Sequence, residues 1–208
     1  MKNLLPSQII LLLRRIQGSD LRDLLKAAAP LSINSLLYKG EASAKRPYRL
    51  PGPFSIKSFS IKELSGVDRI DGRLTPYRLA YVVFCFGEIV HESWVCFDAP
   101  VPSQYGFDFR LPVIDRSFTQ KLYRGKGIFP FTLNYIVHDL QSRRISNGVY
   151  VLVSPTNHAS IRGIQKAGFE LLAHLQGKRL LGLFVFNKSI QRRPSKHDAQ
   201  YFETPIAS

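Results

Sequence analysis

The chain has 208 residues, of which 45% are hydrophobic, so it can bury a substantial core and suits a single domain. Its 29 Lys and Arg residues outnumber its 15 Asp and Glu residues, which gives a formal net charge of +14 at pH 7. Such a balance attracts anionic partners in general. Nucleic acid, an anionic membrane, an acidic carrier protein and a phosphorylated cofactor all remain open.

The cysteines and the N-terminal segment exclude further classes. Cys85 and Cys96 lie inside apolar runs, with no Cys-x-x-Cys pair and no clustered histidines, which argues against a disulfide framework and a structural zinc site. We expect two buried free thiols and no metal site. Polar residues and a proline interrupt the apolar stretch over residues 4–13, and no run reaches the ~20 apolar residues that span a bilayer. The sequence predicts a soluble, cytoplasmic protein, and leaves open a peripheral membrane contact through its basic start.

The first half of the chain predicts helices, a linker and then strands. Apolar residues recur at helical spacing within residues 2–38, and residues 39–53 are basic and rich in Pro and Gly, which is typical of a linker. From Phe54, apolar and polar residues alternate as on a strand with one buried face. The next expected elements are a short helix (62–70), an antiparallel hairpin (79–86 and 89–97, around Gly87-Glu88) and a strand over 109–119.

We expect the chain to be organised around the turn at Gly125 and Gly127. Two glycines two residues apart allow a tight turn and leave backbone N–H groups uncovered. Pro130 suits the first turn of a helix. Apolar residues then follow at helical spacing: Phe129, Leu133, Ile136, Val137 and Leu140. Such a turn is an anion site, usually for phosphate, and Arg124 and Lys126 add positive charge. Taken alone, a basic turn that binds nothing fits the pattern equally well.

The rest of the chain predicts a strand, a short helix and two more strands. The run over residues 149–153 is almost continuously apolar, which indicates a strand covered on both faces. Asn157 suits the N-cap of a helix that ends at Ala167, and Gly168 suits its C′ position. Two strands are expected at 169–175 and 180–186, followed by a polar tail from residue 188.

Two motifs in this second half carry a family resemblance. The pattern Arg/Gln-x-x-Gly-x-Gly/Ala falls on Arg124, Gly127 and Phe129, and a second motif falls on Asn157, Ser160, Lys166, Gly168 and Phe169. With these motifs, the order of elements over residues 54–187 resembles the GCN5-related N-acetyltransferase (GNAT) superfamily. Val90 to Val95, with Phe118-Thr119, resembles members from polysaccharide and other biosynthetic pathways.

The resemblance implies an α/β fold. Its sheet is mixed, mostly antiparallel and twisted, with a splayed central strand pair and flanking helices, and an N-terminal helical extension precedes it. The implied domains are an N-terminal helical extension and linker (1–53), an acyltransferase domain (54–187) and a polar C-terminal tail (188–208).

The resemblance also implies an enzyme with acetyl-CoA, or another acyl-CoA, as donor substrate. Its pyrophosphate would lie on the amides of Gly125–Phe129, and its pantetheine arm would pair with the strand that ends at Phe118-Thr119. A primary amine of a small molecule, for example an amino sugar, would attack the thioester directly, and a backbone N–H near Phe118 would stabilise the oxyanion. The implied donor-binding residues are Phe118, Thr119, Arg124, Gly125, Lys126, Gly127, Ile128, Phe129 and Asn157.

Two positions depart from the family pattern. Phe129 replaces a small residue next to the phosphate, so its ring must point away or the donor must shift. Ile164 stands where many members have a tyrosine that protonates the leaving thiolate, so the usual acid is absent.

Three residues are candidates for catalysis. His91 is the first candidate for a base, because imidazole titrates near neutral pH, although a histidine that is simply packed in a strand fits equally well. Glu92 alternates with His91, so only one of them can face the cleft. Tyr123 is a candidate donor to the thiolate, with support of the turn as the alternative.

Other functions remain open on the sequence alone. Some relatives in the family take long acyl chains from acyl carrier protein, and the net charge of +14 suits an acidic carrier. A basic nucleic-acid-binding protein is a second class, although no zinc-finger spacing or RNA-recognition signature is present. A non-catalytic scaffold with this fold is a third, because fold does not determine function.

Overall fold

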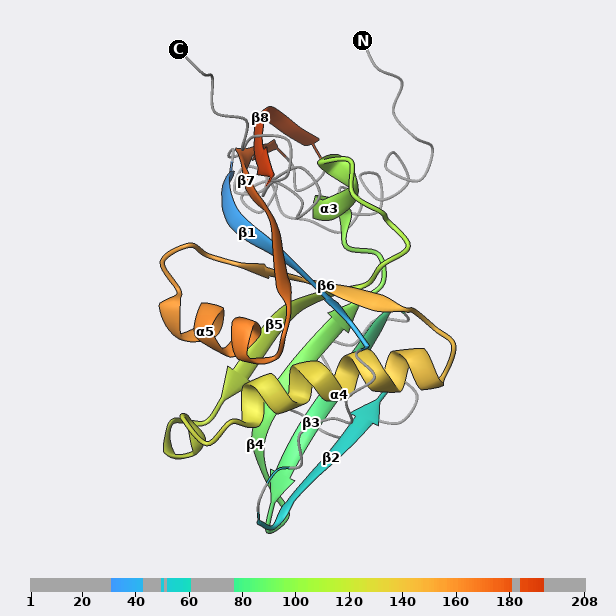
Figure 1. Ribbon diagram of the computed structural model, residues 1–208, viewed down its shortest axis with the longest axis vertical. Coiled ribbons are helices and arrows are strands. Elements are labelled where there is room, and N and C mark those ends of the chain that lie inside the picture. The colour runs from blue at the N-terminus through green and yellow to red at the C-terminus, as the bar shows by residue number, and fades with distance from the viewer. Residues whose placement is uncertain (1–30, 43–49, 51, 61–76, 181–183, 193–208) are drawn as a thin grey trace, which may run out of the picture.

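The computed structural model describes residues 31–42, 50, 52–60, 77–180 and 184–192 (Figure 1). These residues form one sheet of eight strands in the order β2-β3-β4-β5-β6-β1-β7-β8. Its strands are β1 (Leu31–Glu41), β2 (Phe54–Phe59), β3 (Arg78–Cys85), β4 (Glu88–Cys96), β5 (Val113–Thr119), β6 (Gly148–Val153), β7 (Glu170–Leu180) and β8 (Phe184–Arg192). The helices are α3 (Pro100–Gln104), the 3₁₀ turn η2 (Lys121–Tyr123), α4 (Ile128–Ser142) and α5 (His158–Lys166).

The predicted hairpin of β3 and β4 is confirmed, with its turn one residue earlier than the predicted Gly87-Glu88. The residues between the two strands, Phe86 and Gly87, have φ angles of 49° and 85°. Positive φ at both central positions defines the tight turn whose twist matches that of the flanking strands. Cys85 and Cys96 lie in this hairpin and are buried free thiols, as expected.

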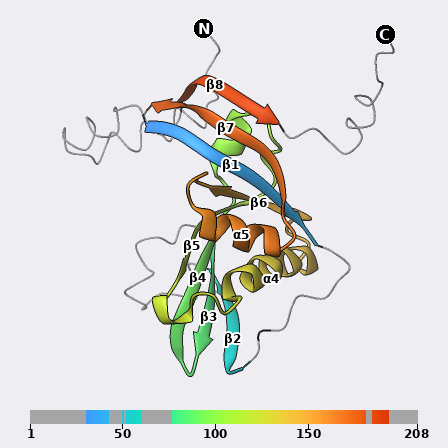
Figure 2. The ribbon, with the colours of Figure 1, turned by 60° about the vertical axis from the view of Figure 1, so that its left-hand side comes forward.

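Helix α4 packs its apolar stripe against the sheet (Figures 1 and 2). Ile136, Val137 and Leu140 are at most 2% exposed and join Val95 of β4 and Val151 of β6 in the largest core cluster. The stripe predicted from the sequence is therefore the buried face. It fixes the N-terminus of α4 over the centre of the sheet, beside the ends of β5 and β6.

The central strands β5 and β6 separate from each other. They are the parallel pair in a sheet whose other pairings are antiparallel, and their register covers only Val113↔Tyr150 and Ile114↔Val151. Beyond Ile114, β5 stays paired with β4 as far as Thr119 but no longer with β6. Asp115 to Phe118 are accordingly exposed, whereas the two paired residues are buried. The predicted splayed strand pair is confirmed.

Strand β1 corrects the predicted N-terminal helix. Leu31–Glu41 is a strand between β6 and β7, antiparallel to both. Leu37 and Tyr38 are 0% and 2% exposed and pack into different core clusters, so adjacent residues are buried on opposite faces. Successive side chains alternate between opposite faces in a strand, whereas in a helix they point only about 100° apart. Residues 31–41 therefore belong to the sheet, although the sequence assigned them to an extension; residues 1–30 lie outside the described part.

The C-terminal strands are also longer than predicted. Strand β7 continues to Leu180, and β8 runs to Arg192, so residues 188–192 are in a strand and not in the predicted tail. The cause is pairing: Ala173 to Leu180 face Arg192 to Phe184 across the antiparallel pair, which satisfies the backbone of a polar segment. The predicted helix at 62–70 and the tail from 193 lie outside the described residues. In the part that the structure describes, no helix is long and apolar enough to cross a membrane.

Candidate functional site

A cleft of about 480 Å³ opens beside the N-terminus of α4. Its walls come from the end of β5, the turn over residues 123–127, the first turn of α4 and the outer face of α5. In Figure 1 the loop before α4 lies next to α5, and β5 ends between them. Nearly all predicted donor-binding residues line this cleft: Phe118, Thr119, Arg124, Gly125, Gly127, Ile128, Phe129 and Asn157. Lys126 lies within the same turn but is not among the lining residues.

The turn has the backbone geometry that the two glycines predict. Gly125 and Gly127 have φ angles of 78° and 77°, a region that side-chain-bearing residues rarely adopt. Gly127 is the N-cap of α4, and the N–H of Phe131 is the first to donate back to its carbonyl, at 3.1 Å. The N–H groups before Phe131 therefore have no carbonyl partner within the helix and are directed at the cleft end. A helix N-terminus with such donors attracts an anion.

Four cationic side chains surround this helix end. Arg124 donates from Nε to the carbonyl oxygen of Thr119 at 3.0 Å, which fixes its position beside the cleft. Lys126 lies with Nζ 5.0 Å from the ring centre of Tyr123. Arg162 and Lys166 reach the same cleft from α5. Neither Arg162 nor Lys166 was predicted to bind the donor; their i, i+4 spacing on one face of α5 was the available signal.

The ring of Phe129 lies against α5. A Cβ atom added to Gly163 would come within 2.6 Å of Cδ1 of Phe129, so the ring occupies the space that a side chain at Gly163 would fill. The ring centre is also 6.0 Å from that of His91. Gly163 of α5 thus leaves room for the ring of Phe129, which stands where the family pattern has a small residue. This contact between Phe129 and Gly163 was not predicted from the sequence.

A second hollow of about 270 Å³ lies between the separated strands. Ile114 and Ser117 of β5 face Val153 of β6 across it, and Phe129 and Asn157 line both hollows. The strands next to the turn are parted, and Phe129 lies at the boundary between the two hollows. The two hollows adjoin, since both are lined by Ser117, Phe129, Asn157 and Ser160.

His91 lies beneath the cleft and not in its wall. It is 1% exposed, its Nδ1 is 2.7 Å from Oγ1 of Thr119, and its Nε2 is 2.9 Å from Oγ of Ser93. Ser93 Oγ is in turn 2.7 Å from Oγ of Ser117. Burial lowers the pKa of His91 to about 3, so the imidazole is neutral near pH 7. Thr119 and Ser117 reach the cleft, and His91 joins them from below.

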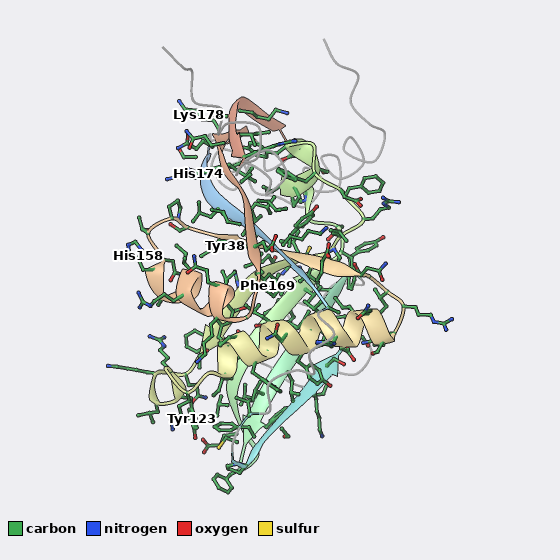
Figure 3. The ribbon with its side chains drawn as sticks, in the orientation of Figure 1. Tyr38, Tyr123, His158, Phe169, His174 and Lys178 are labelled. Atoms are coloured by element: carbon green, nitrogen blue, oxygen red, sulfur yellow. The ribbon has the colours of Figure 1, made fainter. Side chains whose placement is uncertain are left out.

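The other two candidates for catalysis occupy different places. Glu92 follows His91 in β4, so its side chain lies on the opposite face of the sheet, the face that also carries Trp94. Tyr123 lines the cleft and packs edge-on against Phe54, with ring centres 6.2 Å apart. Partial burial raises the pKa of Tyr123, which keeps its hydroxyl protonated. Figure 3 shows Tyr123 beside the turn that precedes α4.

Asn157 and Ile164 define the α5 side. Oδ1 of Asn157 accepts a hydrogen bond from the N–H of Ser160 at 3.1 Å, so this side chain caps α5. Ile164 is 0% exposed and packs in the core, so no acid occupies the position where the family often has a tyrosine. His158, at the start of α5 in Figure 3, is exposed. Among the described residues, no group of three or more His, Cys, Asp or Glu side chains could hold a metal ion.

The separated strand pair, followed by the glycine turn and α4, decides the fold. It is a GNAT-type fold. The mostly antiparallel sheet, its parallel pair β5 and β6 and the helix that starts at the gap match the arrangement that the resemblance implied, whereas β1 between β6 and β7 was not implied. The fold assignment rests on this topology.

Structure comparison finds distant similarity to solved structures of GNAT proteins. No protein-family model matches the chain, and no curated protein matches it. A GCN5-related N-acetyltransferase from Kribbella flavida is 12% identical with a TM-score of 0.48, over 73% of this chain and 60% of that chain. One from Sphaerobacter thermophilus is 15% identical with a TM-score of 0.45, over 77% and 56%. A tandem GNAT protein from the clavulanic acid biosynthesis pathway is 14% identical with a TM-score of 0.43, over 66% and 50%. This chain therefore spans about half to three fifths of their length.

Proposed function

We propose that the protein is an N-acetyltransferase that transfers the acetyl group of acetyl-CoA to a primary amine of a small molecule. The observation that supports this most directly is that two features adjoin: a helix end with unpaired amide donors and a hollow between parted strands. A donor with a diphosphate at one end and a thioester at the other needs both. Amino sugars are the acceptor class that we propose to test first.

The donor would bind along this path. Its diphosphate would lie over the amides from Gly125 to Phe129, where backbone donors and the helix dipole favour negative charge. Arg162 and Lys166 would add attraction from the opposite wall. The pantetheine arm would then follow β5 beyond Ile114, where the backbone is no longer paired with β6. Unpaired strand backbone offers hydrogen bonds to the amides of such an arm.

The chemistry would depend mostly on positioning. A neutral amine would attack the thioester carbonyl, and a backbone N–H near Phe118 would stabilise the oxyanion. Among the described residues, the ionisable side chains that line the main cleft are Tyr123, Arg124, Arg162 and Lys166, all toward the diphosphate end. None of them is a carboxylate or a histidine, whereas the carboxylate of Asp115 lines the second hollow, so the proton would leave the nitrogen through Asp115, water or hydroxyl groups.

Calorimetry with coenzyme A tests the donor site. We expect Arg124→Ala combined with Gly127→Val to lower the affinity for coenzyme A by roughly 10-fold or more, since the change removes a cation and distorts the amide turn. A matched control is Arg110→Ala, because Arg110 is an exposed arginine that pairs with Asp108 and does not line the cleft. Equal affinities in all three proteins would remove the donor site from the turn.

Release of free coenzyme A thiol tests the reaction. The full chain would be incubated with acetyl-CoA and a panel of primary amines that includes amino sugars, polyamines and amino acids. We expect thiol release that depends on the amine, with the acetylated amine identified by mass spectrometry. Tight binding of coenzyme A without amine-dependent release for any amine would favour the non-catalytic scaffold.

A second candidate keeps the fold and changes the donor to an acyl carrier protein with a long acyl chain. The observation that favours it is an apolar, basic surface at the cleft mouth. Leu122 is 83% exposed and Phe118 is 52% exposed, and Lys121, Arg124 and Lys126 surround them in the chain. An acidic carrier suits such a surface by charge. Faster transfer from an acylated carrier than from acyl-CoA of the same chain length would establish this donor.

A further inference from the structure

A continuous hydrogen-bonded chain runs from Ser117 through Ser93 and His91 to Thr119. Ser117 is 2.7 Å from Ser93, Ser93 is 2.9 Å from Nε2 of His91, and Nδ1 of His91 is 2.7 Å from Thr119. The register of β4 and β5 builds this chain, because His91 lies opposite Thr119 and Ser93 lies opposite Ser117. Residues two apart on a strand share a face, so all four polar groups lie on the same side of the sheet.

Both ends of this chain open into the cleft, whereas its middle is sealed. Ser117 and Thr119 line the cleft. His91 and Ser93 are 1% and 0% exposed. Ser117 also lines the second hollow, between β5 and β6, whereas Thr119 lies nearer to the turn. The chain thus joins Thr119, next to the turn, to Ser117, which also lines the hollow between the strands.

The surroundings keep the imidazole neutral and isolated. Burial is the cause of its low pKa, and no charged side chain contributes to that shift. Its neighbours are Val83 of β3, opposite in the register, and the ring of Phe129 of α4. Tyr81 lies opposite Ser93 in the register, and its hydroxyl donates to Asp139 at 2.7 Å. A neutral imidazole has one N–H donor and one bare nitrogen, so it can accept a proton on one side while it releases one on the other.

We propose that Thr119, His91, Ser93 and Ser117 form a proton relay that supplies the leaving thiolate with its proton. This inference rests on the proposed acyl transfer. Ser117 meets the sulfur, because a donor whose diphosphate lies at the turn extends its far end into the second hollow, which Ser117 lines. The relay takes over the role of the acid that Ile164 cannot provide.

The proton steps balance as follows. The amine nitrogen bonds to the acetyl carbon, the C–S bond breaks, and the excess proton on nitrogen passes to water. Ser117 gives its proton to sulfur and receives one from Ser93, which receives one from Nε2 of His91. Nδ1 receives the proton of Thr119, and water at the cleft mouth restores that of Thr119. After the transfer, each hydroxyl hydrogen points the opposite way and the imidazole proton is on Nδ1. Once the products leave, water in the cleft gives a proton to Ser117, and protons move back through the four residues until Thr119 releases one to water.

The variant His91→Gln tests this directly. Glutamine has an amide donor and a carbonyl acceptor, so it can keep both hydrogen bonds, but it does not exchange protons between them as imidazole does. With acetyl-CoA and hydroxylamine as acceptor, we expect kcat to fall roughly 100-fold, while the affinity for coenzyme A stays unchanged. His174→Gln is the matched control, since His174 is also a strand histidine, bonded to Asn34 at 2.6 Å outside the cleft.

The leaving group separates a relay from a merely structural role. S-acetyl-4-nitrothiophenol releases a weakly basic thiolate that needs no proton, so the loss in His91→Gln should shrink to less than about 3-fold with this donor. Ser117→Ala should behave in the same way, and it provides the test if the buried variant does not fold. Equal losses with both donors, or no loss with acetyl-CoA, would overturn the relay. Failure of the proposed function is distinct, because the unmodified protein would then show no amine-dependent thiol release at all.

Discussion

His91 also makes a prediction about stability, which does not depend on any reaction. Its pKa is lowered to about 3 by burial, whereas a histidine in an unfolded chain titrates near 6.5. As the pH falls through about 6.5, the unfolded chain takes up a proton that the folded chain does not. The stability that neutral His91 provides is therefore complete above this pH and is lost progressively toward pH 3.

Urea unfolding at several pH values measures this effect. Relative to His91→Gln, the free energy of unfolding of the unmodified protein should fall by about 2 kcal/mol between about pH 8 and about pH 5. The same comparison with His174→Gln corrects for the removal of a histidine as such. If the curves for the unmodified protein and His91→Gln run parallel over this range, the imidazole is accessible to protons in the folded state.

Phe129 and Gly163 make a second prediction at the scale of residues. Alanine at Gly163 would place Cβ 2.6 Å from Cδ1 of Phe129. We expect Gly163→Ala to destabilise the protein by about 1–3 kcal/mol, because the ring is confined between α4 and α5. Adding Phe129→Leu should restore part of this loss, since the smaller side chain vacates the space. Additive effects of the two changes in thermal unfolding would show that the ring does not depend on the glycine.

At the scale of elements, α5 depends on its N-cap. Oδ1 of Asn157 accepts from the N–H of Ser160, and the capped end faces the cleft. Asn157→Ala should lower the free energy of unfolding by about 1 kcal/mol, whereas Asn157→Asp should retain the cap. Thermal unfolding measures both, and calorimetry with coenzyme A shows whether the cap also affects the donor. An alanine variant as stable as the aspartate variant would mean that the side chain contributes nothing to the helix.

The elements also show which structures the sequence could predict. The hairpin at Gly87 and the helix after Gly127 follow from local signals, since positive φ and a one-sided apolar stripe are both recorded within a few residues. Strand β1 is different. Its apolar pair at Leu37 and Tyr38 is compatible with a buried helix, and only its partners β6 and β7, more than a hundred residues away, make it a strand.

The same division applies to the candidate site. The turn at Gly125 and Gly127 and the cap at Asn157 were predicted from residue types that a backbone conformation requires. The hydrogen-bonded link between His91 and Ser117 could not be predicted from the sequence, because it depends on the register of β4 and β5. A bulge near Trp94 shifts this register. A one-residue difference in that register would place the two side chains on opposite faces.

At the scale of the whole molecule, the net charge of +14 must be separated from the site. Any strongly basic protein attracts polyanions, and salt weakens that attraction. A built anion site differs, because backbone amides and nearby cations in a cleft hold one ligand at short range, where screening is weaker. The two kinds of binding should therefore respond differently to ionic strength.

We expect the affinity for coenzyme A to fall by less than about 10-fold between 50 and 200 mM salt, and the affinity for a random-sequence duplex DNA to fall by roughly 1000-fold. Arg124→Ala should weaken binding of coenzyme A and leave binding of the DNA almost unchanged, because the DNA contacts the overall charge and coenzyme A contacts the cleft. Fluorescence anisotropy with labelled DNA and calorimetry with coenzyme A provide both measurements. DNA binding that persists at high salt and discriminates between sequences would instead favour a nucleic-acid-binding protein, since attraction to the backbone alone gives neither property.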